Sequence, residues 1–172
     1  DTTESRGLGD VYKRQHNFFM SNEIRPVIIK SFEELNKTEL YQIAQLRIAV
    51  FIVEQDCPYP DLDDMDQESL HVWIRDGNEI VSYLRITPPG LRFVEPSLGR
   101  IVTKQNYRSK GFAENLIKQA INHIYAEKPE AIRISAQSYL EKYYEKFGFF
   151  KASDEYLEDN IPHIEMLLDA KN

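Results

Sequence analysis

The residues Leu98-Gly99-Arg100-Ile101-Val102-Thr103 lead into Arg108-Ser109-Lys110-Gly111-Phe112-Ala113, and this stretch decides the fold. The first segment predicts a β-strand. The second opens a long helix, expected over residues 109–126, because apolar side chains recur there at every fourth position. A strand that passes through a basic loop into a helix is a common context for a ligand at a helix N-terminus.

The beginning of this helix has the chemistry of an anion-binding site. Backbone N–H groups in a first turn have no acceptor within the helix, and the helix dipole adds partial positive charge. Gly111 and Ala113 are small enough for a phosphate to approach the backbone, and Arg108 and Lys110 add charge. We therefore expect residues 108–113 to bind phosphate. The segment lacks the Gly-Lys-Ser or Gly-Lys-Thr of a Walker loop and the three-glycine dinucleotide fingerprint.

The remaining patterns predict an α/β fold with a mixed, largely antiparallel sheet flanked by helices. Asp76-Gly77-Asn78 is a turn signal between two strand-like runs, which we expect to pair as a hairpin. Thr38 is the expected N-cap of the first helix. The order along the chain is β-α-β-β-β-α-β-α-β-β, without the regular alternation of a doubly wound fold. The expected strands cover residues 24–30, 71–75, 79–87, 98–103, 132–135, 149–155 and 164–168, and the expected helices cover 38–53, 109–126 and 139–147.

Length, composition and charge narrow the class of protein. A chain of 172 residues, 42% hydrophobic and 28% charged, fits one globular domain with a core. Cys57 is the single cysteine, so no disulfide can form within the chain, which favours a reducing, cytoplasmic setting. No apolar run reaches the roughly 18 residues that span a membrane. The net charge of −7, without a clustered basic face, argues against nucleic acid and favours cations such as protonated amines.

Residues 1–19 differ from the rest of the chain. They carry scattered charges and glycines without an apolar period, and Met20 follows them as a native start would. We interpret 1–19 as a tag or vector-derived leader, with a genuine disordered arm as the alternative. Residues 20–172 are then a single domain.

Two motifs resemble those of the GNAT acetyltransferases. The strand followed by Arg-x-x-Gly-x-Ala and a helix resembles the acyl-CoA pyrophosphate loop of that superfamily. The strand 132–136, the helix containing Tyr143-Tyr144-Glu145-Lys146 and the sequence Phe147-Gly148-Phe149 resemble its second signature. The stretches 46–55, Cys57-Pro58-Tyr59 and 156–164 further resemble ElaA-type members. The resemblance covers residues 24–168, and its combined motifs are specific although each alone is weak.

The resemblance implies acetyl-CoA as cofactor and a direct attack by a primary amine on its thioester. In such proteins the backbone at Ile101, Val102 and Thr103 pairs with the pantetheine arm, and one N–H polarises the thioester carbonyl, an effect of roughly 3–4 kcal/mol. The loop Arg108–Ala113 holds the pyrophosphate. Gln137 stands where the family often has asparagine, which leaves the side-chain contact to pantetheine open at this position.

Two proton transfers need side chains. An amine with a pKa of about 10.4 requires a base near neutrality, and Glu54 is the first choice, with His71, Glu158 and His163 as alternatives that would face the acceptor. Tyr144 occupies the place where the family commonly has a tyrosine that protonates the departing thiolate. The alternative for Tyr144 is packing in the core.

The loop after the first helix contains four aspartates. They form either a solvated surface or an acidic wall of the substrate entrance that favours a cationic amine. No histidine or cysteine spacing indicates a metal site, and Cys57 is expected to be an ordinary loop thiol. The four are Asp61, Asp63, Asp64 and Asp66.

The sequence leaves more than one function open. The first is an N-acetyltransferase for a small amine, a peptide N-terminus or a lysine side chain. The others are a non-catalytic acyl-CoA-binding or regulatory module, and an interaction domain that uses the fold as a scaffold. The resemblance also allows a homodimer.

Overall fold

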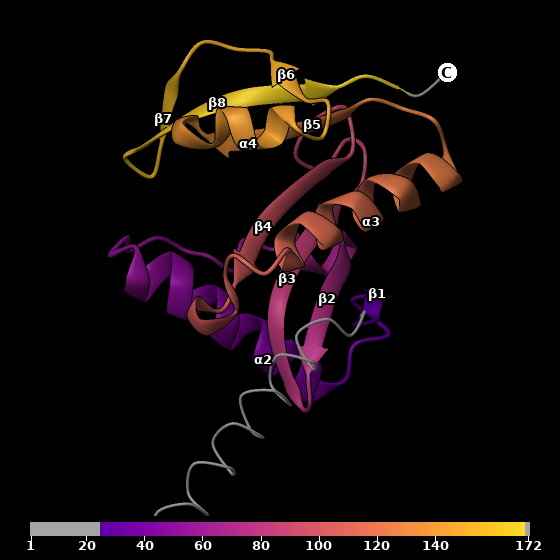
Figure 1. The fold of residues 1–172 in the computed structure, drawn as a ribbon, viewed down its shortest axis with the longest axis vertical. Coiled ribbons are helices and arrows are strands. Elements are labelled where there is room, and N and C mark those ends of the chain that lie inside the picture. The colour runs from indigo at the N-terminus through magenta and orange to yellow at the C-terminus, as the bar shows by residue number, and fades with distance from the viewer. Residues whose placement is uncertain (1–24, 171–172) are drawn as a thin grey trace, which may run out of the picture.

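The computed structural model describes residues 25–170, and the predicted leader 1–19 lies outside this range. Its elements form two sheets with helices packed against them (Figure 1). The strands are β1 (Val27–Ser31), β2 (Leu70–Asp76), β3 (Glu79–Thr87), β4 (Ser97–Thr103), β5 (Ile132–Gln137), β6 (Phe150–Lys151), β7 (Tyr156–Glu158) and β8 (Ile161–Leu168), and the α-helices are α2 (Lys37–Arg47), α3 (Phe112–Glu127) and α4 (Glu141–Glu145).

Both sheets are antiparallel within themselves. The first has the order β1-β2-β3-β4, and its β2–β3 hairpin turns at the predicted position through Gly77, which has φ 58°. In the second sheet β5, β6 and β7 all pair with β8. The predicted class, an α/β fold with largely antiparallel strands flanked by helices, is confirmed.

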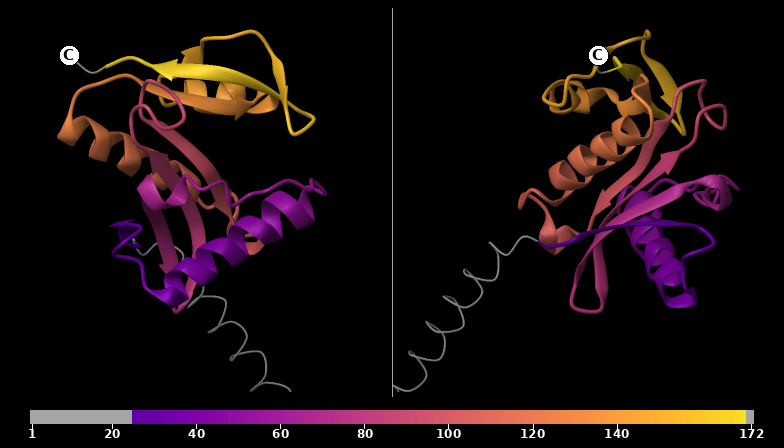
Figure 2. Two further views of the ribbon diagram at one scale, coloured as in Figure 1. Left: turned by 180° about the vertical axis from the view of Figure 1, so that it is seen from behind. Right: turned by 90° about the vertical axis from the view of Figure 1, so that its right-hand side faces the viewer.

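The first sheet is covered by α3 on one face and by α2 on the other (Figure 2). Successive side chains of a strand point to opposite faces, and β2 shows the consequence. Val72 and Ile74 pack in the core that contains α3, whereas Trp73 between them packs in the core that contains α2. Ile134 and Met166 of the second sheet extend the core that contains α3, so one hydrophobic core continues from the first sheet to the second.

Both long helices begin elsewhere than predicted. The N-cap of α2 is Asn36, whose side chain accepts a hydrogen bond of 2.8 Å from the Glu39 N–H, so the prediction of Thr38 was wrong. An asparagine side chain makes this bond to the third helical residue readily. The second helix begins at Phe112 rather than Ser109, because Ser109 has φ 60° and is not helical.

The first helix changes its winding at Arg47. Over Ile48–Glu54 the chain widens to i→i+5 hydrogen bonds, such as the 3.1 Å bond from the Gln55 N–H to the Val50 carbonyl. A regular α-helix to residue 53 was therefore not found. β-branched side chains crowd this segment, and they pack poorly against the preceding turn of an α-helix.

The helix and the first strand that follow β5 are shorter than expected. The helix predicted over 139–147 shortens to α4 after a 3₁₀ turn at Ser138–Leu140, and the strand predicted over 149–155 shortens to β6. β7 was not predicted, and β8 begins at Ile161. The two are joined by Asp159 and Asn160 with φ 47° and 62°, the pair of left-handed residues that a tight hairpin turn requires.

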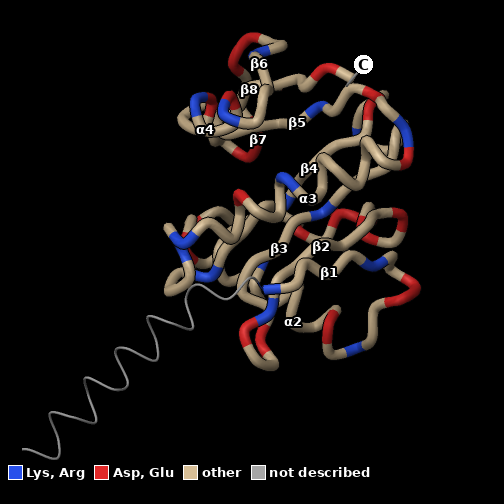
Figure 3. The backbone as a smooth tube through the Cα atoms, turned by 45° about the vertical axis from the view of Figure 1, so that its right-hand side comes forward, with Lys and Arg blue, Asp and Glu red and all other residues tan. Residues whose placement is uncertain are grey.

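Charges of both signs are spread over the chain trace (Figure 3). Lysines and arginines lie beside acidic residues, for example where Arg133 pairs with Glu95 at 3.0 Å and Glu165 at 3.1 Å. Within residues 25–170, none of the helices combines the length and the apolar character that a bilayer crossing requires.

Candidate active site

A cleft lies between β4 and β5, the facing edges of the two sheets. Near their first residues the strands are joined by a 3.1 Å hydrogen bond from the Arg133 N–H to the Pro96 carbonyl. Apart from this contact, the two strands belong to different sheets. The cleft comprises two adjoining hollows of about 520 and 440 Å³, and both are lined by Ile101, Leu140 and Tyr144.

β4 is bulged where it lines the cleft. The register with β3 shifts so that Arg100 and Ile101 together face the single residue Leu84. Arg100 has φ 52°, a left-handed conformation that costs a non-glycine residue roughly 1–2 kcal/mol. The bulge leaves the backbone around Ile101 out of the regular β3 ladder, at the junction of the two hollows.

The larger hollow, which we call the loop-side hollow, lies at the end of β4 and the beginning of α3. Most of the predicted cofactor-binding residues line it, namely Ile101–Thr103 and residues 108, 109 and 111–113. Lys110 does not line it, and its ammonium group lies over the ring of Tyr107, 5.6 Å from the centroid. Glu114 also lines the hollow, but its charge is paired with Lys118 at 2.9 Å.

The backbone before α3 forms an open cradle. Gly111 is the N-cap at φ 83° without a side-chain cap, so the first N–H groups of the helix are not capped by that residue. A Cβ atom at this position would meet no heavy atom within 4 Å apart from the adjoining backbone, which shows that the space next to Gly111 is open. With Ser109 also left-handed, these conformations resemble the backbone concavities that bind anions.

The smaller hollow, the strand-side hollow, contains a hydrogen-bonded group centred on Glu158 and His163. The Glu158 carboxylate lies 3.2 Å from His163 Nε2 and accepts hydrogen bonds from Arg92 at 2.6 Å and Ser135 at 3.3 Å. His163 Nδ1 lies 2.7 Å from the Ile161 carbonyl. A carbonyl only accepts, so Nδ1 carries a proton. The Glu158 carboxylate also only accepts, so Nε2 donates to it when His163 is protonated and has a free lone pair when His163 is neutral.

Tyr144 of α4 lies where the two hollows meet. It is 7% exposed, and its ring makes edge contacts with Tyr143 and Phe149 at centroid distances of 5.3 and 6.1 Å. Burial raises the pKa of Tyr144 above its usual value, so the phenol remains protonated at neutral pH. The ring is thus part of the core, as one alternative predicted, while the residue also borders the cleft.

With this geometry established, comparison with known proteins identifies the family. Residues 39–170 match the model of the acetyltransferase (GNAT) domain. The chain belongs to the GNAT family. The fold and the family predicted from the two signatures are therefore confirmed.

ElaA-type proteins are among the similar GNAT proteins. Protein ElaA of Escherichia coli is 34% identical over 138 residues, covering 77% of this chain and 89% of the relative, and a UPF0039 protein of Schizosaccharomyces pombe is 38% identical over 145 residues, covering 83% and 95%. The crystal structure of E. coli ElaA superimposes with a TM-score of 0.79 at 30% identity, covering 85% of this chain and all of that one. An acyl-CoA N-acyltransferase from Pseudomonas aeruginosa gives 0.78 at 32%, covering 83% and 99%.

Two of the predicted catalytic candidates of this GNAT chain lie away from the strand-side hollow. Glu54 forms a bidentate pair with Arg108, with one N–O distance of 2.6 Å, and lines neither hollow. The bonds from Arg108 lower the pKa of Glu54, which makes it a weaker base. His71 is fully buried, bonded to the Tyr83 hydroxyl at 2.7 Å and the Asp66 carbonyl at 2.9 Å, so it cannot contact an acceptor. Its position contradicts a substrate-facing role.

The four aspartates of the loop also differ from expectation. Asp61 and Asp66 are buried and paired with arginines, so a solvated surface is wrong for them. Asp63 lines the strand-side hollow, but two arginines neutralise its charge. Asp64 alone of the four is exposed. The cluster is therefore an ion-pair network, whose acidity is balanced within the protein.

Several residues of the strand-side hollow were not predicted. Arg92 and Ser135 both bond to Glu158, and Ser135 also lies 2.5 Å from the Tyr156 hydroxyl. The alternation of β5 could have indicated Ser135, because it follows the buried Ile134 and must face the other way. Gln137, whose contact to a pantetheine arm the sequence left open, lines this hollow and not the loop-side one.

Proposed function

We propose that this protein is an acetyl-CoA-dependent N-acetyltransferase that transfers the acetyl group to a primary amine by direct attack. The observation that carries the proposal is the meeting of two hollows at Ile101 and Tyr144. One hollow has the features of an anion cradle, and the other holds a carboxylate–imidazole pair. Two substrates bound from the two sides would meet at the bulged strand, as a ternary-complex reaction requires.

The loop-side hollow fits the cofactor. The open space before Gly111, the uncapped first turn of α3 and the Arg108 guanidinium suit a diphosphate, and the free edge of β4 suits the amide groups of a pantetheine arm. When bound there, acetyl-CoA supplies the activated acyl group and the thiolate leaving group. The backbone at Ile101 supplies the donor that polarises the carbonyl.

The strand-side hollow supplies the proton acceptor. We assign this role to His163 rather than to Glu54. Neutral His163 accepts a proton at Nε2, and Glu158 at 3.2 Å stabilises the imidazolium that results. Asp159 also lines the hollow, and its carboxylate favours an acceptor that arrives as an ammonium ion.

Tyr144 supplies the proton on the opposite side of the reaction. Its hydroxyl has no hydrogen-bond partner among residues 25–170, so the O–H is available to a ligand at the junction of the hollows. Because the pKa of this phenol is raised, it acts chiefly as a hydrogen-bond donor to the leaving sulfur.

The proposal is tested with acetyl-CoA and three acceptor classes: small amines, peptide N-termini and lysine peptides. Acetyl-CoA is expected to raise the melting temperature, and at least one class should release free thiol. Stabilisation without thiol release from any acceptor would instead indicate a non-catalytic acyl-CoA-binding module. Absence of both effects would contradict the cofactor site itself.

Replacing His163 tests the proton acceptor. His163→Gln keeps a polar side chain that cannot take a proton near neutrality, so kcat should fall by about 100-fold while acetyl-CoA affinity stays within about twofold. His123→Gln is the control, because His123 lies on α3 outside both hollows. An unchanged kcat in His163→Gln would remove His163 from the mechanism.

Replacing Tyr144 tests the donor at the thiolate. Tyr144→Phe should lower kcat by roughly 10- to 100-fold with little change in acetyl-CoA affinity measured by calorimetry. Tyr143→Phe is the matched control, since Tyr143 is its neighbour on α4 and lines only the loop-side hollow. If the two variants retain equal turnover, Tyr144 is a packing residue only.

A further inference from the structure

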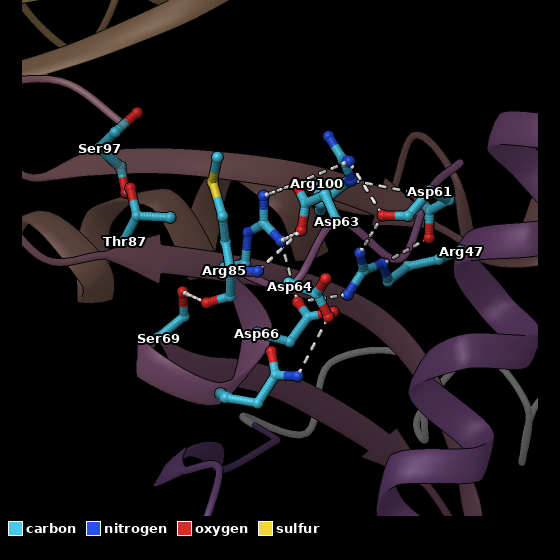
Figure 4. Close-up of polar contacts among 12 residues, drawn as sticks. Arg47, Asp61, Asp63, Asp64, Asp66, Ser69, Arg85, Thr87, Ser97 and Arg100 are labelled. Carbon is cyan, nitrogen blue, oxygen red and sulfur yellow. Dashed lines mark hydrogen bonds and ion pairs between the residues drawn. The ribbon is translucent and has the colours of Figure 1, made fainter. Parts of the chain in front are cut away.

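Arginines and aspartates beside the cleft form a closed ring of alternating charge (Figure 4). Each arginine contacts two of the aspartates, and each aspartate contacts two of the arginines. We call this group the ionic ring. Its contacts in order are Arg47–Asp61 at 2.9 Å, Asp61–Arg100 at 2.9 Å, Arg100–Asp63 at 3.2 Å, Asp63–Arg85 at 2.7 Å, Arg85–Asp66 at 2.9 Å and Asp66–Arg47 at 2.7 Å.

The ring is mostly buried, with one side at the strand-side hollow, and it is balanced in charge. Arg47 and Arg85 are 1% and 0% exposed, and the side chains of Arg100 and Asp63 are 15% and 22% exposed. Burial opposes ionisation of Asp63, yet the bonds from Arg85 hold the pKa of this carboxyl well below its usual range. Asp63 therefore remains charged at neutral pH. Because the ring has three arginines and three aspartates, removal of any one member leaves one charge of the group uncompensated.

The ring ties together four segments that are distant in sequence. Arg47 ends α2, the aspartates belong to the loop 61–66, Arg85 lies on β3 and Arg100 lies on β4. Arg100 is also the strained residue of the β4 bulge, with φ 52°. Its side chain is the part of the ring that borders the strand-side hollow together with Asp63.

We propose that the ionic ring positions the β4 bulge, so that Arg100 is held in its left-handed conformation and the backbone of Ile101 is fixed at the junction of the two hollows. The ring residues are positioning residues, which act through the backbone. A strained conformation persists only where its surroundings hold it, and the two aspartates on the Arg100 guanidinium provide that restraint. The catalytic consequence rests on the proposed function, whereas the structural consequence does not.

The first test compares two neighbouring aspartates. Asp63→Asn removes one charge of the ring, while Asp64→Asn makes the same change at an exposed residue outside it. In Asp63→Asn the amides of residues 99–102 should exchange with solvent about tenfold faster or more, with smaller changes in α3. Calorimetry should still give one coenzyme A per chain, with the Kd within about threefold, because the diphosphate cradle lies outside the ring. Where an acceptor is turned over, kcat should fall by about 10- to 100-fold.

The second test separates backbone restraint from loss of the side chain. Arg100→Gly and Arg100→Ala both remove the guanidinium, but only glycine adopts a left-handed conformation without strain. The glycine variant should therefore keep a kcat about tenfold higher than the alanine variant, and its 99–102 amides should be better protected.

The outcomes separate failure of this proposal from failure of the proposed function. Unchanged exchange at 99–102 in Asp63→Asn, or equal behaviour of the two Arg100 variants, would overturn the positioning role. A global rise in exchange throughout residues 25–170 would also overturn it, because the ring would then serve overall stability alone. If no amine is acetylated, the exchange measurements still decide the positioning role.

Discussion

Arginine meets carboxylates in two contrasting regions of this molecule. In the ionic ring every charge has two partners, and Arg47 and Arg85 are almost entirely buried. At the mouth of the loop-side hollow, Arg108 and Glu54 form one bidentate pair whose side chains are 38% and 37% exposed. The chemistry of the two contacts is the same, but their surroundings differ.

The difference indicates which contacts are permanent. Arg47 and Arg85 have almost no water to replace a lost partner, so opening the ring at either of them is costly. The Arg108–Glu54 pair is solvated, and an exposed pair of this kind contributes little to stability. Under the proposed function, a phosphate of the cofactor would replace Glu54 beside Arg108. We interpret the ring as a fixed part of the scaffold and the pair as an exchangeable contact at a binding site.

The largest effect on stability is predicted for a substitution that breaks the ionic ring. Arg85→Met should lower the free energy of unfolding by about 3–5 kcal/mol, because Asp63 and Asp66 would lose a shared buried partner. Urea denaturation followed by circular dichroism measures this change. Arg133→Met is the control, since Arg133 also binds two carboxylates but is 22% exposed, and its loss should cost under about 1 kcal/mol. Similar losses in the two variants would remove the distinction between the ring and a surface pair.

The next largest effect is predicted at the Gly111 cradle of the loop-side hollow. Gly111→Glu should weaken coenzyme A binding by at least about 100-fold, because it strains a residue at φ 83° and places a negative charge in the open space of the cradle. Isothermal titration calorimetry measures the affinity. Gly90→Glu is the control, as Gly90 has φ 84° and equally open surroundings in a loop outside both hollows. Equal affinity in wild type and Gly111→Glu would show that the diphosphate binds elsewhere.

The sequence predicted the fold because local patterns and family motifs agreed. The β4–α3 passage, the hairpin at Gly77 and the second signature containing Tyr144 all lie in the expected parts of the chain, although α3 and α4 begin later than predicted. These features depend on neighbouring residues, which a periodic pattern reports directly. The hairpin at Asp159-Asn160 was also local, but an Asp-Asn turn is a weaker signal than one containing glycine.

The features that the sequence did not reveal depend on distant contacts. The pairing of Glu54 with Arg108 spans 54 positions, and the pairing of Arg85 with Asp63 spans 22. Neither has a periodic pattern, so Glu54 was interpreted as a base and the loop aspartates as surface or entrance. The buried bonds of His71 to Tyr83 are likewise invisible until β2 and β3 pair.

The smallest predicted effect is a gain of affinity. Glu54→Gln removes the carboxylate that competes with phosphate for Arg108, so coenzyme A should bind roughly two- to fivefold more tightly, and the melting temperature should hardly change. Titration calorimetry at low and high salt measures this, and the gain should shrink as salt screens the exposed charges. Glu79→Gln serves as the control, because Glu79 forms a comparable exposed pair with Lys104 and lines neither hollow. Weaker binding in Glu54→Gln would mean that Glu54 orients Arg108 for the phosphate, and the pair would then be as fixed a part of the scaffold as the ring.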